Sequence, residues 1–330
     1  MALINLGGLL GGGTTTTTTT TANSGGLLGG GGLLNIVDIG GLIGGLTSGG
    51  TGNTSGGLIN LGVVANLPGI NVINGVATIL SPDGTLLNVN ATSSLLTGTD
   101  LGEVLNVILG DSVILGLGGD DTINGGGGNT TIIGGAGDDR IIGASGNETI
   151  YGGDGNDYID GRGGNDVLFG NKGSDTIIGT SGFDTVFGGQ DADVIDYSAS
   201  ADASILLGNI GNDIVYGGSG NDSLFGGQND DRLFGGAGAD VLNGDLGNDI
   251  LTGGAGADRF VFNAPIDGLI SGNDRITDFN FAQGDRLQVN GQGVNLSSDA
   301  GGNAVLSLSA GGTVTLEGIA AASVQNSWFV

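Results

Sequence analysis

The chain has 330 residues, including 76 glycines, and its 34 acidic and 7 basic residues give a formal charge of −27. It contains no cysteine and no histidine, which excludes disulfides, zinc or haem sites with the usual soft ligands, and Ser-His or Cys-His catalytic pairs. So acidic a chain repels nucleic-acid phosphates and anionic lipid and suits hard cations. A mean hydropathy of +0.22 is too apolar for a charged disordered coil.

Charge divides the chain into three zones, 1–110, 111–262 and 263–330, and the repeats described below place the domain bounds at 1–97, 98–262 and 263–330. Residues 1–110 hold four acidic and no basic residues, whereas residues 111–262 hold 24 acidic and five basic ones. Because the first basic residue is Arg140, no cationic segment precedes the apolar stretches at the start, which argues against a cleaved Sec-type signal peptide. Polar residues and glycine interrupt every apolar run, so no transmembrane segment is expected.

The first domain, residues 1–97, is a low-complexity segment rich in Gly, Leu, Thr and Asn. Gly-Gly-Leu-Leu recurs at 7–10, 25–28 and 31–34, and eight threonines follow one another at 14–21. High β-propensity with almost no charge favours strand addition and edge-to-edge pairing. We interpret this domain as an assembly arm that adds strands to a neighbouring subunit; the alternative is a disordered, sticky tail.

The middle zone is built from a nine-residue repeat without gaps. Nine units occupy residues 116–196 and six occupy 208–261, with an eleven-residue break at 197–207 between the two arrays. Position 1 is glycine in all 15 units, position 4 is glycine in 13, and position 8 is apolar in all 15. Position 6 is acidic in 14 units, and Thr130 is the exception. Four columns held over fifteen units predict a repeat architecture.

Each column has a physical reason. Glycines at positions 1, 2 and 4 allow positive φ angles and close backbone approach in a tight turn. The residues around position 8 form a short strand whose apolar member points inward. Two nonads then make one coil of 18 residues, and stacked coils lie roughly 4.8 Å apart. The predicted fold class is all-β, a right-handed parallel β-roll.

Stacking places the position-6 carboxylates of every second unit above one another. Two carboxylates ~5 Å apart at an effective dielectric of ~20 repel by roughly 3 kcal/mol, so the column requires a cation between its members. Carboxylates and turn carbonyls in flexible loops suit Ca²⁺ better than Mg²⁺. The predicted metal ligands are the carboxylates of Asp121, Asp139, Asp157, Asp175 and Asp193 on one side, Asp166 and Asp184 on the other, and Asp213, Asp222, Asp231, Asp240, Asp249 and Asp258 in the second array. The turn glycines assigned to the same sites are Gly134, Gly135, Gly137, Gly152, Gly153, Gly155, Gly217, Gly218, Gly220, Gly235, Gly236 and Gly238.

The units read glycine-glycine-x-glycine-x-aspartate-x-apolar-x, and residues 152–159 and 217–224 match this pattern in full. The pattern resembles the RTX (haemolysin-type calcium-binding) repeat family. The resemblance implies a parallel β-roll folded by several Ca²⁺ ions and export by a type I secretion system. Thr130 and Glu148 depart from the motif on one side, so the sites there are expected to be weak or absent. A flexible Gly/Asp-rich linker, the alternative, would not keep an apolar residue at every ninth position.

Weaker repeats flank the arrays. Upstream, Glu103 with Leu105 and Ser112 with Ile114 occupy positions 6 and 8 of an extended frame, so residues 98–115 are interpreted as degenerate coils that cap the roll. Downstream, the order of residues 253–287 is similar to the closing β-domain of serralysin-type secreted proteins, which carries the type I secretion signal.

The C-terminal zone contains three further features. Asp278 and Asp285 either bind one more ion or are solvated turn carboxylates. Alternating apolar residues at 304–308 and 314–316 predict a hairpin turned by Gly311 and Gly312. The last four residues, 327–330, are either part of the export signal or a plain final strand.

Residues 1–97 carry no Gly-x-Ser-x-Gly, His-Glu-x-x-His or Walker motif, so an enzyme is not expected. The predicted function is a secreted calcium-binding structural protein that folds on Ca²⁺ outside the cell and self-assembles into a filament, sheath or surface layer. Its expected partners are further copies of itself and the type I secretion machinery. The alternative is a calcium-dependent adhesin or polysaccharide-binding module at the cell surface; exposed aromatic or basic stripes would favour that alternative.

Overall fold

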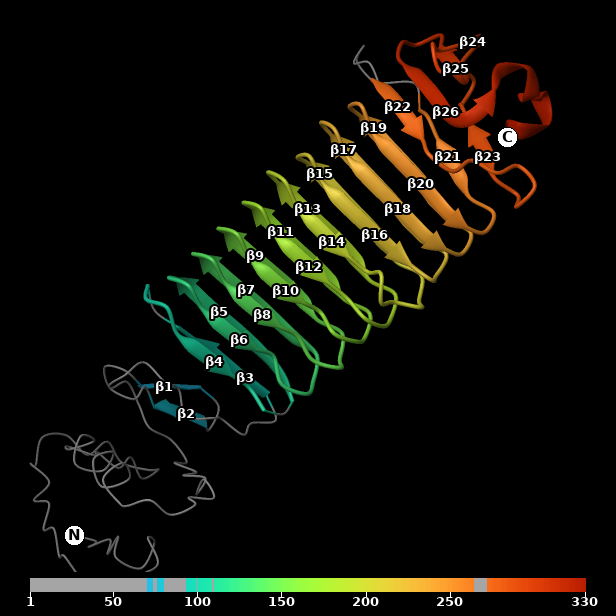
Figure 1. Ribbon diagram of the computed structural model, residues 1–330. Helices are drawn as coiled ribbons and strands as arrows, with labels where there is room; N and C mark the ends of the chain where they lie inside the picture. Colours follow the sequence, from blue (N-terminus) through green and yellow to red (C-terminus); the bar gives the residue numbers. More distant parts are fainter. Residues whose placement is uncertain (1–69, 74–75, 80–92, 99, 109, 264–271) are drawn as a thin grey trace, which may run out of the picture.

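The computed structural model describes residues 70–73, 76–79, 93–98, 100–108, 110–263 and 272–330. Almost all of the predicted assembly arm lies outside the described residues. Within it, β1 (Ile70–Ile73) and β2 (Val76–Ile79) form an antiparallel pair. From β3 onward, the described chain winds into a stack of coils that ends in further strands near the C-terminus (Figure 1).

Two parallel sheets form the walls of the stack (Figure 1). Sheet I contains β3 (Ser93–Thr97), β5 (Asp111–Gly118), β7 (Thr130–Ala136), β9 (Thr149–Asp154), β11 (Val167–Lys172), β13 (Thr185–Gln190), β15 (Ile205–Ile210), β17 (Ser223–Gln228), β19 (Val241–Leu246), β21 (Arg259–Val261) and β23 (Arg286–Gln288). The parallel part of sheet II contains β4 (Val104–Asn106), β6 (Thr122–Asn124), β8 (Arg140–Ile142), β10 (Tyr158–Asp160), β12 (Thr176–Ile178), β14 (Val194–Asp196), β16 (Ile214–Gly218), β18 (Arg232–Ala237), β20 (Ile250–Ala255) and β22 (Asn273–Ile276). Successive strands along the chain alternate between the sheets, as the two-nonad coil requires.

The register confirms the predicted coil of 18 residues and the inward position-8 column. Ile159 pairs with Ile141 on one side and with Ile177 on the other. These three side chains, like the other position-8 residues of the fifteen units, are fully buried in a single core that runs between the sheets. Residues 7 and 9 of each unit flank this position and point to the outer side of their strand, where most of them are half-buried or exposed; Ile142, Asn243 and Val261 are buried there. The all-β parallel roll predicted from the repeat is therefore the observed fold.

The eleven-residue break does not separate two arrays, and that part of the prediction is wrong. Leu206 of β15 is buried and pairs with Val186 before it and Leu224 after it. The segment therefore forms one more half-coil, which contains two extra residues. Ser204 stands at position 6 of this half-coil, two residues before Leu206. The fifteen units and the break form one continuous roll.

The roll extends upstream of the regular repeats. β3 pairs with β5, and β4 pairs with β6, both parallel. Leu96, Leu105 and Ile114 are buried and continue the apolar column. β3 spans Ser93–Thr97, so the roll includes residues that the predicted domain boundary assigned to the assembly arm.

The C-terminal zone closes the other end of the roll. β22 and β23 continue sheets II and I, and their residues Ile276 and Leu287 continue the apolar column. β24 (Val294–Ser298), β25 (Asn303–Leu308) and β26 (Thr313–Ala320) then form an antiparallel meander, and β26 joins β22 in parallel. The predicted hairpin is confirmed, because Leu306 pairs with Val314 and both turn glycines have positive φ.

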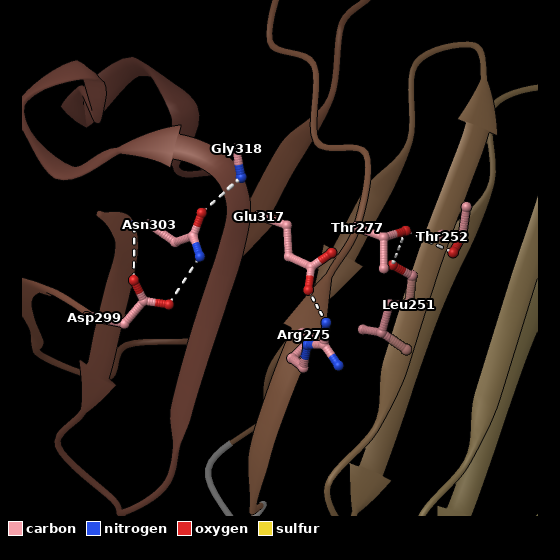
Figure 2. Close-up of polar contacts among 8 residues, drawn as sticks. All are labelled: Leu251, Thr252, Arg275, Thr277, Asp299, Asn303, Glu317 and Gly318. Atoms are coloured by element: carbon pink, nitrogen blue, oxygen red, sulfur yellow. Dashed lines mark hydrogen bonds and ion pairs between the residues drawn. The ribbon is translucent and has the colours of Figure 1, made fainter. Parts of the chain in front are cut away.

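Polar contacts hold this cap to the roll (Figure 2). Arg275 of β22 forms an ion pair with Glu317 of β26. The hydroxyls of Thr252 and Thr277 lie 2.8 Å apart and join β20 to the turn after β22. Asn303 accepts a hydrogen bond from the Gly318 N–H at 2.9 Å, which supports the irregular end of the β25–β26 pair (Figure 2).

The end of the chain is a short 3-10 turn, η4 (Asn326–Trp328), after a similar turn, η3 (Ala321–Ser323). The Trp328 ring is buried, and its centroid lies 5.1 Å from that of Phe279 and 5.7 Å from that of Phe281. Phe329 forms an isolated parallel bridge to Leu287. A plain final strand is therefore wrong: the last residues form a turn that places the Trp328 ring against Phe279 and Phe281, with one bridge residue after it.

Candidate calcium ladder

The position-6 side chains form two columns, one on each edge of the roll. Each Asp Oδ1 accepts the backbone N–H of the position-6 residue one coil earlier: Asp139 N–H donates to Asp157 at 2.9 Å, and Asp157 N–H donates to Asp175 at 2.7 Å. Column A contains Glu103, Asp121, Asp139, Asp157, Asp175, Asp193, Asp213, Asp231, Asp249 and Asp274. Column B contains Ser112, Thr130, Glu148, Asp166, Asp184, Ser204, Asp222, Asp240, Asp258 and Asp285. The thirteen aspartates predicted as ligands therefore all lie in two continuous columns.

The second oxygen of each of these carboxylates is buried and has no hydrogen-bond partner. This holds for the Oδ2 atoms of the thirteen predicted aspartates and for Oε1 of Glu148, whose residues are at most 2% exposed. A buried polar atom without a partner costs free energy, and an ionised one costs more. The columns consequently present fourteen oxygens that require either protons or cations.

The glycine at position 1 makes room for these oxygens. A Cβ built on Gly152 or on Gly235 would lie within 2.8 Å of two oxygens: Oδ2 of its own unit's aspartate and the glycine carbonyl oxygen of the next coil. Carboxylate and carbonyl oxygens from two coils therefore converge where a side chain would otherwise stand. Twelve position-1 glycines contact Oδ2 of their own unit in this way: Gly116, Gly134, Gly152, Gly161, Gly170, Gly188, Gly208, Gly217, Gly226, Gly235, Gly244 and Gly253.

Positive φ belongs to positions 2 and 4 and not to position 1, which corrects part of the sequence interpretation. Gly135, Gly137, Gly153 and Gly155 have φ between 124° and 137°. Gly218, Gly236 and Gly238 likewise have positive φ, whereas Gly220, beside the break, does not. Where positions 2 or 4 are not glycine, Asn or Asp often replaces it, as these residues tolerate the left-handed region best. Glycine at position 1 is therefore required for space, and glycine at positions 2 and 4 is required for the backbone conformation.

Burial raises the pKa of the column carboxyls far above their ordinary values. The pKa rises to about 7 for Asp157, to about 8 for Asp193 and Asp231, and to about 6 for Asp213. Hydrogen bonds from the backbone lower each pKa, but burial outweighs them, and neighbouring carboxylates add to the increase for Asp157, Asp193 and Asp231. At neutral pH the columns thus hold carboxyl groups that ionise only at a cost, which a bound cation would remove.

These residues fit calcium. Among the described residues, no group of three or more acidic side chains surrounds a single point, so an ion here would take one or two carboxylates and complete its shell with turn carbonyls. Oxygen-only donors in flexible loops match Ca²⁺ chemistry. Bound calcium would supply the positive charge that the buried carboxylates lack, and its binding free energy would become folding free energy.

Column B is less regular than column A at its N-terminal end. The Thr130 hydroxyl donates to the Gly125 carbonyl at 3.0 Å, so this side chain is satisfied within its own turn. One oxygen of Glu148 accepts the Ala144 N–H at 3.1 Å, also within its own turn. Ser112 and Ser204 supply no carboxylate. The weaker sites expected on this side stay a prediction.

At the C-terminal end, the structure separates the two aspartates that the sequence singled out. Asp278 lies outside the columns and accepts hydrogen bonds from the Gly253 and Gly254 N–H groups at 3.0 and 2.7 Å. Asp285 continues column B, but both its oxygens are used, by Asp258 N–H at 3.1 Å and Asn280 N–H at 2.8 Å. Burial raises the pKa of Asp274, which continues column A, to about 8. Sequence reasoning missed Asp274, although the Asp-Arg-apolar triplets at 258–260, 274–276 and 285–287 could have revealed it.

A second ladder at position 5 was also missed. Its side chains are exposed, and each Asn or Asp oxygen accepts the N–H of the residue one coil later: Asn165 N–H donates to Asn147, and Asn147 N–H donates to Asn129. The direction is opposite to that of the position-6 ladder. Position 5 is Asn or Asp in ten of the fifteen units. This regularity is weaker than that of repeat positions 1, 4, 6 and 8. This ladder satisfies turn N–H groups and leaves the position-6 carboxylates for another role.

A known protein family matches the repeat segment. The RTX calcium-binding nonapeptide repeat (4 copies) matches overlapping segments that together span residues 97–260. The AlgE6R3 subunit of mannuronan C5-epimerase from Azotobacter vinelandii is 30% identical, with 40% of this chain and 80% of that chain covered and a TM-score of 0.25. Extracellular lipase LipA from Serratia marcescens is 19% identical, with 67% of this chain and 40% of that chain covered and a TM-score of 0.26. No curated protein matches the chain significantly.

The part of the chain that the structure describes contains no helix with the length and apolar character needed to cross a membrane. What it contains is a parallel roll whose buried carboxylate columns suit multiple calcium ions, in the segment that the family matches. The chain belongs, through residues 97–260, to the RTX calcium-binding nonapeptide repeat family.

Proposed function

We propose that this protein is a secreted, non-enzymatic structural protein that folds on calcium outside the cell and self-assembles into a filament, sheath or surface layer. The observation that carries the self-assembly is the outer face of sheet I, which we call the uncharged face. Its two outward rows are Val113, Thr131, Thr149, Val167, Thr185, Ile205, Ser223 and Val241, and Leu115, Ile133, Tyr151, Phe169, Phe187, Leu207, Phe225 and Asn243.

The contrast with sheet II supports this assignment. The two outward rows of the uncharged face hold no ionisable group other than the Tyr151 phenol, in a chain with a formal charge of −27. Beyond these rows the same strands carry the Asp154–Lys172 ion pair and Asp245, which accepts a hydrogen bond from the Asn243 amide. The outward rows of sheet II include Arg140, Asp160, Asp196 and Arg232. Two copies that approach through the uncharged face avoid the like-charge repulsion that most other approaches would incur. Long apolar patches on a soluble protein mark interaction sites.

The rings on this face favour a flat apolar partner over a sugar. Tyr151, Phe169 and Phe187 form a stack with centroid separations of 4.8 and 4.9 Å and interplanar angles of 3° and 5°. Both faces of the Phe169 ring are therefore covered by its neighbours, and only ring edges point outward. A sugar that packs on an aromatic face has no such surface here, whereas a second sheet packs on a plane of ring edges and β-branched side chains.

The size of the face suits a second copy of the chain. Eight strands at ~4.8 Å spacing and about three residues per strand at ~3.3 Å give on the order of 400 Å² for the two rows. A standard interface buries about 800 Å² per partner. A face-to-face pair of rolls would thus bury about half of a standard interface through these rows, and the predicted N-terminal arm would supply further contacts and link such pairs into a polymer.

Calcium couples export to assembly in this proposal. The family's repeats are typical of secreted proteins, and type I secretion passes an unfolded chain. Where calcium is scarce, ionised columns oppose folding; where it is abundant, binding stabilises the folded roll by mass action. The uncharged face exists only in the folded roll, so assembly would follow calcium.

The test compares two matched substitutions. Phe169→Glu places a charge in the uncharged face, and Phe234→Glu does the same in a stacked pair (Tyr216 and Phe234, 4.9 Å apart) on the outer face of sheet II. Both variants are first shown to fold with calcium by circular dichroism. Light scattering and electron microscopy should then show calcium-dependent polymers for the wild type and Phe234→Glu and smaller species for Phe169→Glu.

Monodisperse wild-type monomers at high concentration in calcium would overturn the assembly proposal and favour the adhesin, which binding to a polysaccharide array would then detect. Equal losses in both variants would remove the assignment to the uncharged face. Deletion of residues 1–57 separates the contributions: polymers that persist without this segment would show that the predicted arm is dispensable.

A further inference from the structure

Positions 1 and 6 of the repeat vary together in the roll between residues 98 and 261. Two half-coils lack glycine at position 1, with Val107 and Tyr197 in its place, and both have serine at position 6, Ser112 and Ser204. Half-coils with glycine at position 1 have an acid at position 6, apart from the one with Thr130. Because the position-1 glycine makes room for the carboxylate, a large residue there and a carboxylate at position 6 compete for one space.

Tyr197 occupies that space in the middle of column B. Its residue is fully buried, and its N–H donates to the Tyr216 carbonyl at 2.9 Å, so the backbone continues β14. A Cβ built on Gly179, one coil earlier, would meet the tyrosine ring and would lie 2.6 Å from its hydroxyl oxygen. At twelve other position-1 glycines the same construction meets the aspartate Oδ2 of the unit. The phenol therefore fills the region where column B elsewhere places its carboxylate oxygen.

The Tyr197 hydroxyl lies beside the buried Asp184 carboxyl; burial raises the pKa of this carboxyl, and the hydroxyl lowers it through a side-chain interaction. In the same half-coil as Tyr197, the Ser204 hydroxyl is also buried. Of these three side chains only Asp184 is an acid. A phenol is neutral at pH 7, and serine supplies no charge, so column B has no buried carboxylate at the level of Ser204. Asp166 and the exposed Asp202 still raise the pKa of Asp184, and the neutral O–H group of Tyr197 stands beside this carboxyl where the other half-coils would need an ion.

Column A is not interrupted at the same level. Asp193 N–H donates to Asp213 Oδ1 at 2.8 Å across the 20-residue offset, the same contact as in the regular coils. In column B, Ser204 N–H donates to Asp222 Oδ1 at 2.8 Å, so the hydrogen-bond ladder resumes with the next coil. The break thus affects one edge of the roll only.

We propose that Tyr197 replaces a calcium ion in column B, so that the half-coil 197–207 is an ion-free joint. Column B then consists of two separate ion ladders, one from Glu148 to Asp184 and one from Asp222 to Asp258. Column A is a single ladder that spans both. The calcium response of the two halves of the roll is coupled through column A and through the shared apolar core, and not through column B.

The test restores the repeat at the joint. The double variant Tyr197→Gly/Ser204→Asp recreates the glycine–aspartate pair of the other units, and calcium stoichiometry is measured by isothermal titration calorimetry on the full chain. We expect one more ion per chain than in the wild type and a steeper calcium-dependent transition by circular dichroism. Unchanged stoichiometry in a variant that folds would overturn the proposal.

A second variant keeps the volume of the ring and does not depend on refolding of the joint. Tyr197→Phe removes only the hydroxyl, so the proposal predicts the wild-type number of ions. Loss of one ion in Tyr197→Phe would mean that the hydroxyl ligates calcium, which contradicts the proposal. Neither result depends on self-assembly, so failure here leaves the assembly proposal standing, and the converse also holds.

Discussion

Neutralising one carboxylate in the middle of column A should change the stability of the metal-free and the calcium-bound roll in opposite directions. Asp157→Asn keeps the shape of the side chain and an oxygen that can accept the Asp139 N–H. Burial is the main cause that raises the Asp157 pKa from 3.8 to about 7. The ionised form therefore costs about 4 kcal/mol in the folded state, at about 1.4 kcal/mol for each pKa unit. Two or three such groups equal the whole stability of an ordinary domain, about 5–15 kcal/mol.

The direction in which stability changes with pH follows from the raised pKa of the folded state. Because the folded pKa lies above the unfolded one, the metal-free roll binds more protons than the unfolded chain between these two values and loses stability as the pH rises through them. Asp157→Asn removes one of these groups, so the metal-free variant should keep its β-structure to a higher pH than the wild type. The same variant lacks a calcium ligand and should need more calcium to fold at neutral pH.

The assay is circular dichroism against pH in metal-depleted buffer, followed by a calcium titration at neutral pH. The matched control is Asp154→Asn, which makes the same charge change at a side chain that is 61% exposed and paired with Lys172. The control should shift neither midpoint appreciably. If Asp157→Asn lowers metal-free stability, or if Asp154→Asn reproduces its effects, the argument from buried carboxylates fails.

Three further predictions test other parts of the roll. In the wild type without metal, β-structure should be greater near pH 5 than near pH 7.5. A carboxyl such as Asp175, whose folded pKa is about 7, lowers the free energy of unfolding by about 2–3 kcal/mol as the pH rises over that range. A β-signal that is independent of pH would contradict the pKa shifts, and pH 5 keeps the chain above its pI of about 4.1. Gly170→Ala should raise the calcium midpoint and lower the unfolding free energy by at least ~2 kcal/mol, because its methyl would collide with Asp175 Oδ2 and the Gly188 carbonyl. The control is Gly293→Ala, where the nearest atom is 3.5 Å away. Equal effects of the two variants would refute the argument that the position-1 glycine makes room for the carboxylate. Trp328→Ala should lower the free energy of unfolding by about 3–5 kcal/mol in denaturant titrations with calcium, because the ring is buried against Phe279 and Phe281. A change below ~1 kcal/mol would show that the terminal turn is not needed to close the core.

Much of the fold could be predicted from the sequence because the repeat makes every local choice agree. An apolar residue at every ninth position has only one consistent arrangement, in which all such residues face one core, and the fully buried Ile159 and Leu224 confirm it. The stacking of the acidic residues was equally predictable, since a fixed offset of 18 residues determines which carboxylates lie above one another. The antiparallel hairpin near the C-terminus was predictable from alternation and two glycines.

The errors and omissions arose where three-dimensional context decides. Residues 197–207 do not show the repeat, yet they form a half-coil because Leu206 can enter the core while two extra residues lie outside it. The role of the position-1 glycine depends on the distance to an aspartate five residues away, and Asp274 could be recognised as a column member only once β22 was paired with β20.

The amino-acid sequence alone therefore determined the period, the inward residue and the acidic column of this protein, because these depend on spacing along the chain. The tertiary structure decided which oxygens are left without partners, which side chain fills a place in column B, and that the outward rows of sheet I form one uncharged face. Those properties depend on contacts between residues one or more coils apart, and the spacing of residue types does not specify which atoms meet across a coil.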